Sequence, residues 1–216
     1  MINNNKKKTL ARSFLLIGTL FFVSAASLIL YNRGEEILAK QQAENVLTQL
    51  YAKSLGSEHN PPDYILNPNM EMPTIEIDGN FYIGSLQFST LNIELPVMSS
   101  WSYSGLKISP CLYSGSIYQK NAVIAAHNYI SHFGRLTELS QGDKITFTDV
   151  DNNIFIYEVI VQEVLVPTAI DDMLDNDADL SLFTCTLGGT SRFTVRCKLL
   201  ETNSLQSMGH NIDHLL

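Results

Sequence analysis

The clearest candidates for chemistry are a cysteine and an arginine that a short turn would bring together. Cys185 ends one apolar run, Arg192 begins the next, and the intervening Gly188-Gly189 is typical of a two-residue hairpin turn. That turn would set Cys185 opposite Arg192, with Cα atoms about 5 Å apart. The apolar residues of both strands would then share the other face. A guanidinium beside a thiol favours the thiolate and can bind an oxyanion, so the pair indicates nucleophilic catalysis.

A nucleophilic cysteine also needs an acid–base partner, and His127 is the best placed of the five histidines. It ends the strand-like run 122–127, after two alanines that allow close approach of a strand or a substrate. Spacing alone does not bring His127 to Cys185, and a histidine at a strand end is often structural. The other four lie in linker, loop and tail segments: His59, His132, His210 and His214.

A metal site is the alternative that the acidic segment before Cys185 suggests. Asp175, Asp177 and Asp179 have the spacing with which a calcium-binding loop begins. Leu180 then stands where such a loop needs glycine, and Thr186 where it needs glutamate. We therefore expect a solvated loop, with no metal and no cofactor.

Composition excludes several classes of protein. The chain has 216 residues, of which 45% are hydrophobic and 17% charged, which is typical of a globular domain and not of a disordered chain. With 14 basic against 22 acidic side chains, the net charge of −8 is the opposite of what nucleic-acid binding favours. Three cysteines do not make a disulfide framework. Cys111 and Cys197 fit the role of small buried hydrophobic residues.

The N-terminal part predicts a membrane anchor. Residues 1–12 form a basic tail, and residues 13–32 contain no charge and are long enough to span roughly 30 Å as a helix. The positive-inside rule places the tail in the cytoplasm and the remaining chain outside the cell. A cleaved signal peptide with Ser24 and Ala26 at its cleavage site is the alternative, and it leaves the same domain outside.

The rest of the chain predicts a mainly β domain. Residues 33–73 divide into a juxtamembrane helix over 34–55 and a linker rich in proline and glycine. From residue 74 to 200, seven or eight short strands separated by turn residues, with one short helix near 133–139, favour a closed or nearly closed β-barrel. Residues 201–216 read as a polar tail. The strand candidates are 81–83, 91–95, 122–125, 144–148, 154–166, 180–184 and 193–199.

Three segments together resemble the sortases, which are membrane-anchored cysteine transpeptidases of Gram-positive bacteria. Residues 181–185, Ser-Leu-Phe-Thr-Cys, resemble the family motif TLxTC, with serine in place of the first threonine. Ala125-Ala126-His127 resembles the Ala-Gly-His of the catalytic histidine, and Arg192 takes the place of the arginine after the cysteine strand. The resemblance covers residues 74–200. The stalk helix and the stretch after His127 are more similar to class B or a related subclass than to class A.

The resemblance implies a sortase-like barrel with Cys185 as nucleophile, His127 as acid–base and Arg192 as oxyanion partner. Thr184, Ala126 and Asn128 would contact the substrate. Arg196, four residues beyond Arg192 on the same predicted face, is a second candidate for the arginine role.

The partners that the resemblance implies are secreted proteins with a C-terminal sorting signal, an amine of a peptidoglycan precursor or a pilin, and membrane lipid. The enzyme would be a single-pass membrane protein with an extracellular catalytic domain. A secreted papain-like cysteine protease and a non-catalytic extracellular binding barrel are the alternatives. The first requires a helix after the cysteine, where this sequence predicts a turn and a strand.

Overall fold

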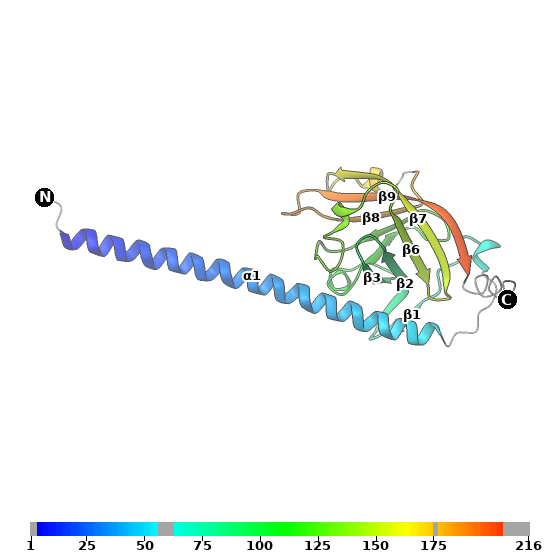
Figure 1. Ribbon diagram of the computed structural model, residues 1–216, viewed down its shortest axis with the longest axis horizontal. Helices are drawn as coiled ribbons and strands as arrows, with labels where there is room; N and C mark the ends of the chain where they lie inside the picture. Colours follow the sequence, from blue (N-terminus) through cyan, green and yellow to red (C-terminus); the bar gives the residue numbers. More distant parts are fainter. Residues whose placement is uncertain (1–3, 56–62, 175–176, 205–216) are drawn as a thin grey trace. The chain divides into compact units, whose positions relative to one another are not determined.

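The computed structural model describes residues 4–55, 63–174 and 177–204. The chain starts with one long helix, α1 (Asn4–Ser54), and continues into a β domain (Figure 1). Contacts divide the chain into two compact units, residues 1–38 and 39–216. Because α1 continues through Gly34 without a break, the predicted anchor and the predicted juxtamembrane helix are parts of a single helix.

The first unit is apolar over the predicted anchor, residues 13–32. Its large side chains are exposed, as Leu15 at 71% and Phe22 at 75% illustrate. By length and composition the helix can cross a membrane, a property that signal sequences near an N-terminus share.

The second unit begins with the last turns of α1, which pack on the β domain. The buried positions are spaced four, three, four and four residues apart, as one face of a helix requires. Ile37 and Tyr51, which the apolar pattern also placed on this face, are exposed. The Ser54 carbonyl at the helix end accepts a hydrogen bond from Asn152 Nδ2 at 3.4 Å. The buried residues are Ala39, Ala43, Val46, Leu50 and Ser54.

Eight of the nine strands in the described chain form a closed barrel, which confirms the predicted fold class. The ring follows the order β2-β3-β4-β5-β8-β9-β7-β6 and closes through antiparallel pairing of β6 with β2, while β1 adds to the start of β2. Gly84 allows the closure, because a Cβ there would lie 2.1 Å from the Thr148 carbonyl oxygen. The strands are β1 (Ile75–Ile77), β2 (Asn80–Phe88), β3 (Ile93–Met98), β4 (Cys111–Ser114), β5 (Ala122–Ala125), β6 (Lys144–Asp149), β7 (Asn153–Leu165), β8 (Leu180–Cys185) and β9 (Arg192–Ser204).

The strand assignments differ from the sequence prediction at the short and irregular elements. The two missed strands, β1 and β4, have only three and four residues. The predicted strand 91–95 begins two residues later, as β3, and the predicted helix near 133–139 is a 3₁₀ turn at Leu136–Glu138. β9 continues to Ser204, so four residues of the predicted polar tail belong to the barrel, and the remainder of that tail lies outside the described residues.

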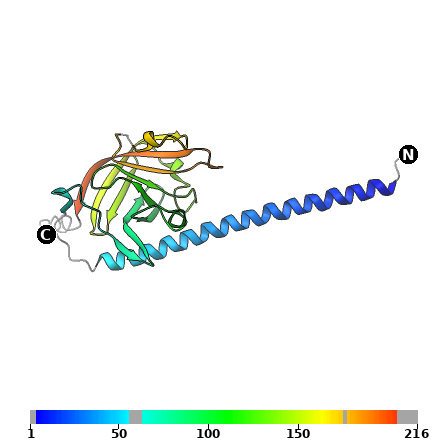
Figure 2. The same cartoon turned by 180° about the vertical axis from the view of Figure 1, so that it is seen from behind.

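Two long strands, β7 and β9, pair along most of their length and curve along the barrel wall (Figure 2). Two irregularities in their register supply the curvature, because a β-bulge bends its strand and increases its twist. The β8–β9 register matches the prediction, and the core residues that it specified are all fully buried: Leu180, Leu182, Val195 and Cys197.

The turn between β8 and β9 is longer than predicted. The Gly189 N–H donates to the Thr186 carbonyl at 2.8 Å, so the turn spans residues 186–189 and is not a two-residue loop at Gly188-Gly189. Gly188 and Gly189 both have positive φ, +81° and +71°, which favours glycine. The Thr186 N–H still pairs with the Ser191 carbonyl, at 3.0 Å, and this keeps the register of the strands beyond it.

Candidate active site

The candidate residues lie at one end of three neighbouring strands, β5, β8 and β9. β5 and β8 are parallel, with Ala122 opposite Leu180 and Ala125 opposite Phe183. Continuing this register by two residues sets His127 level with Cys185. His127 follows two residues after the end of β5, and its side chain lines the same pocket as Cys185. The fold therefore brings together the histidine and the cysteine that spacing could not.

A side-chain hydrogen bond extends the β5–β8 pairing to the site itself. The Ala126 N–H donates to the Phe183 carbonyl at 3.2 Å, and Thr184 Oγ1 donates to the Ala126 carbonyl at 2.9 Å. Thr184 is only 5% exposed, and its hydroxyl is directed toward the strand that precedes His127. This bond ties the histidine strand to the cysteine strand one residue before each reactive side chain.

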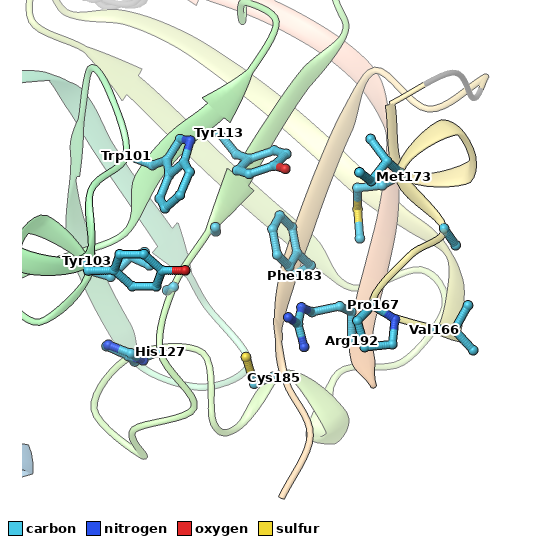
Figure 3. A pocket seen from close by; sticks show the side chains of 15 residues that line it. Trp101, Tyr103, Tyr113, His127, Val166, Pro167, Met173, Phe183, Cys185 and Arg192 are labelled. Carbon is cyan, nitrogen blue, oxygen red and sulfur yellow. The ribbon is translucent and has the colours of Figure 1, made fainter. Parts of the chain in front are cut away.

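Cys185 lies directly opposite Arg192 in the β8–β9 register, as predicted. Figure 3 shows the Cys185 side chain between those of His127 and Arg192. Nη1 of Arg192 donates to the carbonyls of Gly189 and Ser191 at 3.3 and 3.1 Å. The β8–β9 turn therefore supports one edge of the guanidinium.

Behind His127, an aromatic row extends into the domain. The His127 ring lies 5.0 Å from the Tyr129 ring, which lies 5.5 Å from the His132 ring. His132 is fully buried, and its two ring nitrogens have no well-formed hydrogen bond within the described chain. The nearby backbone of Ala39 slightly favours the charged form of the ring. Burial, and secondarily the charge of His127, lowers the pKa of His132 to about 4.

The reactive side chains open into a pocket of about 270 Å³. Aromatic residues form one wall: Trp101 and Tyr113 have ring centroids 5.7 Å apart, and Tyr113 meets Phe183 edge-on at 5.4 Å. The opposite wall comes from the β7–β8 connection, which contains the short helix α3 (Ile170–Leu174) (Figure 3). The lining residues that the sequence analysis did not identify are Trp101, Tyr103, Leu106, Tyr113, Val166, Pro167, Ala169, Ile170 and Met173.

The only sequence signal for these walls was the density of aromatic residues between β3 and β4, around the short helix α2 (Tyr103–Leu106). The β7–β8 wall had no such signal, because its lining residues are ordinary aliphatic side chains in a segment that reads as a loop.

The three cysteines have different surroundings. Cys111 and Cys197 are fully buried, and burial raises the pKa of both thiols, that of Cys111 to about 11. Such thiols stay protonated and unreactive near neutral pH. Cys185 is partly exposed and lines the pocket with His127 and Arg192. Among the three, Cys185 alone has the access that a nucleophile needs.

The predicted substrate-contacting residues have three different positions. Ala126 lines the pocket. Thr184 lies beneath it, with its hydroxyl bonded to Ala126. Asn128 is exposed and does not line the pocket. Arg196, the second candidate for the arginine role, is buried and bonded to four other residues, and it does not line the pocket either.

The acidic segment provides structural contacts where it is described. Asp179 accepts a hydrogen bond from the Leu199 N–H at 2.8 Å and forms an ion pair with Lys198 at 3.4 Å. Asp175 lies outside the described residues. Within the described ranges, no three histidine, cysteine or acidic side chains are grouped as metal ligands.

Comparisons with known proteins agree with this geometry. A family model described as "Sortase domain" matches residues 86–200. A sortase D5 transpeptidase of Clostridium perfringens superposes with a TM-score of 0.55 at 20% identity, covering 76% of this chain and 99% of that one. Sortase C of Streptococcus pneumoniae gives 0.53 at 19% identity, with 80% and 92% covered. Sortase E of Streptomyces avermitilis gives 0.50 at 19%, with 58% and 92% covered. A comparison with curated proteins gives no match.

Proposed function

Because the chain belongs to the sortase family, we propose that it is a membrane-anchored transpeptidase that cleaves a sorting signal in secreted proteins and joins them to an amine. The observation that carries the proposal is the strand register. It brings the end of β8 with Cys185 between the start of β9 with Arg192 and the segment that follows β5 with His127, and all three residues line a pocket of about 270 Å³.

In the first step, Cys185 Sγ attacks the backbone carbonyl carbon of the sorting signal. Arg192 stabilises the oxyanion of the tetrahedral intermediate by charge-assisted hydrogen bonds. The peptide C–N bond then breaks, and His127 donates a proton to the leaving amine. The product is a thioester between the secreted protein and Cys185.

In the second step, an amine attacks the thioester. His127 accepts the proton from this amine, a new C–N bond forms, and the C–S bond breaks with the thiolate as leaving group. The amine belongs to a peptidoglycan precursor or to a lysine of a pilin. Trp101, Tyr113 and the aliphatic β7–β8 wall cover the thioester with apolar surface, which favours a bound amine over bulk water.

The apolar part of α1 supports membrane anchoring with a cytoplasmic N-terminus. Four basic residues precede the apolar segment, so the positive-inside rule directs the catalytic domain to the outer side. Anchoring raises the effective concentration of the enzyme toward substrates held at the same membrane.

Secreted proteins with a sorting signal are the proposed donors. The solved sortase C of Streptococcus pneumoniae is described by its pilin substrate specificity, which supports a pilin amine as one acceptor. We further propose that the enzyme belongs to class B or a related subclass and acts at the cell wall of a Gram-positive bacterium.

The test is an acylation and transfer assay on the full-length protein in detergent micelles. Peptides carrying LPxTG, NPxTN and variants are the donors, and a glycine-based amine and a lysine-containing peptide are the acceptors. Intact-mass measurement should detect an acyl adduct on Cys185, and chromatography should detect the amide product.

The matched variants are Cys185→Ala, which should lose both adduct and product, and Cys111→Ala, which should keep them. Hydrolysis without transfer would indicate a cysteine protease. Absence of any adduct with the whole panel would indicate a binding barrel, and either result would overturn the proposal.

A further inference from the structure

Strand β9 carries a second arginine, Arg196, whose side chain is almost completely buried beside the pocket. It is 5% exposed and lies opposite Ser181 of β8, on the same face as Arg192. A guanidinium that leaves water must find partners for its N–H groups, or its burial is strongly unfavourable. The contacts of Arg196 therefore indicate what this charge is used for.

Four hydrogen bonds surround the Arg196 guanidinium. Nε donates to Glu163 at 2.7 Å, and Nη1 donates to Ser181 Oγ at 2.8 Å and to the Met173 carbonyl at 3.1 Å. Nη2 donates to the Asp172 carbonyl at 2.6 Å. We name this group the Arg196 clamp: the Arg196 side chain, Glu163 of β7, Ser181 of β8 and the two carbonyls of α3. The clamp joins three strands of the barrel to one short helix.

The helix that the clamp holds has little stability of its own. α3 contains five residues, too few to form a stable helix in isolation. Two carbonyls of its last turn, those of Asp172 and Met173, accept hydrogen bonds from the guanidinium. A cation at this end also interacts favourably with the helix dipole. The position of α3 on the barrel therefore depends on Arg196.

α3 is also one wall of the pocket that contains Cys185. Ile170 and Met173 line this pocket, and Figure 3 shows the Met173 side chain on that wall. The Met173 carbonyl accepts the hydrogen bond from Arg196. One residue thus connects the clamp to the surface that a peptide would touch. Arg196 itself does not line the pocket.

We propose that Arg196 is a positioning residue that fixes the α3 wall and thereby sets which peptide side chain the pocket accepts next to the cleaved bond. The inference rests on the proposed function, because it assigns the selectivity of that same site. Lysine cannot replace Arg196, because a single ammonium does not reach a carboxylate, a hydroxyl and two carbonyls in the directions that a planar guanidinium does.

The kinetic test uses Arg196→Gln and Ser181→Ala in the full-length protein in detergent micelles. The donors are peptides that vary one residue of the sorting signal at a time. For the preferred peptide we expect Arg196→Gln to raise KM by roughly tenfold while kcat changes by less than about twofold, the pattern of lost substrate binding. The ratio of kcat/KM for the preferred peptide to kcat/KM for peptides that differ from it at one residue should become smaller. Ser181→Ala should also raise KM and reduce the peptide preference, but each by a smaller factor than Arg196→Gln.

Lys198→Gln is the matched control. Lys198 is on the same strand, is exposed, and pairs with Asp179 and not with α3. Its substitution removes one positive charge from β9 and should leave KM and the peptide preference unchanged.

A second measurement follows the helix directly. Amide hydrogen exchange over residues 169–174 should be faster in Arg196→Gln than in the wild type or in Lys198→Gln. If Arg196→Gln does not fold, Ser181→Ala and Glu163→Ala each remove one bond of the clamp and are judged by the same criteria.

A lower melting temperature with unchanged KM, preference and exchange would overturn the inference, because Arg196 would then support the barrel only. If the wild type processes no peptide in the panel, the proposed function fails, and the exchange measurement alone decides whether the clamp positions α3.

Discussion

The two arginines of β9 differ in how their donors are used. Arg196 donates to four partners and is buried, whereas Arg192 is half-buried, lines the pocket and, within the described chain, uses only Nη1, for two carbonyls of the adjacent turn. Arg192 therefore has the N–H groups of Nε and Nη2 available for an oxyanion in the pocket, whereas Arg196 has one N–H left and does not line the pocket. Four hydrogen bonds at a buried guanidinium therefore require arginine at position 196.

For the same reason, Arg192→Lys should damage catalysis. Lysine keeps the charge but loses the planar set of donors, so we expect kcat to fall by about 10²–10³-fold, as on loss of an oxyanion donor. Steady-state kinetics with the preferred peptide would measure it. The control is Arg135→Lys at a half-buried arginine that pairs with Glu138 and does not line the pocket; its kcat should stay within about twofold of the wild type. Wild-type kcat in Arg192→Lys would remove Arg192 from the mechanism.

At the scale of elements, the bond between Thr184 and Ala126 links the strand of the cysteine to that of the histidine. Thr184→Val keeps the shape but leaves the buried Ala126 carbonyl without this donor, which should cost about 1–3 kcal/mol of unfolding free energy. Because the same bond positions the backbone before His127, kcat should fall as well. Chemical denaturation and steady-state kinetics would measure the two effects.

Thr194→Val is the matched control for that experiment. Thr194 is fully buried on β9, and its hydroxyl has no partner within the described chain. Removing an unpaired buried hydroxyl should leave stability unchanged or slightly raised. If both threonine variants lose the same stability and activity, the bond to Ala126 has no special role.

A second prediction at this scale concerns pH and His132, which is buried where α1 meets the loop after β5. The pKa of His132 falls from 6.5 to about 4 on folding, so the unfolded state binds more protons between these values. Stability from this residue is then complete above pH 6.5 and is lost as the pH falls toward 4, by roughly 2 kcal/mol at pH 5.

Urea unfolding at pH 7.5 and pH 5 would test this expectation. The wild type should lose stability between the two pH values, and His132→Phe, which cannot ionise, should lose roughly 2 kcal/mol less. An equal loss in both proteins would show that other groups cause the acid sensitivity.

At the scale of the whole molecule, the predicted anchor and the first buried residues of the β domain belong to the same helix, α1. Its apolar segment continues beyond Ala26, the last residue of the possible cleavage site, to Leu30. We therefore expect the mature protein to keep its N-terminus. Intact-mass measurement after extraction from membranes should give the uncleaved chain, near 24.1 kDa. A mature N-terminus near Ser27 would identify the segment as a signal peptide.

The amino-acid sequence by itself determined the local features of this protein. The apolar helix, the barrel class, most strands and the pairing of Cys185 with Arg192 follow from hydrophobic periodicity and from one short hairpin, because these depend on residues close in the chain. The predicted length of the β8–β9 turn was wrong. The hydrogen bond from the Gly189 N–H to the Thr186 carbonyl forms a turn over residues 186–189 in place of a two-residue loop.

The tertiary structure decided how distant segments meet. His127 reaches Cys185 through parallel pairing of β5 with β8, whose residues are separated by 58 positions at the Thr184–Ala126 bond. Many partners are available to a short apolar strand such as β5, and only closure of the whole barrel selects one. The pocket wall at α3 follows the same logic. No local sequence pattern predicts where Asp172 and Met173 lie. Their carbonyls are bound by Arg196 of β9, which is distant from them in the sequence.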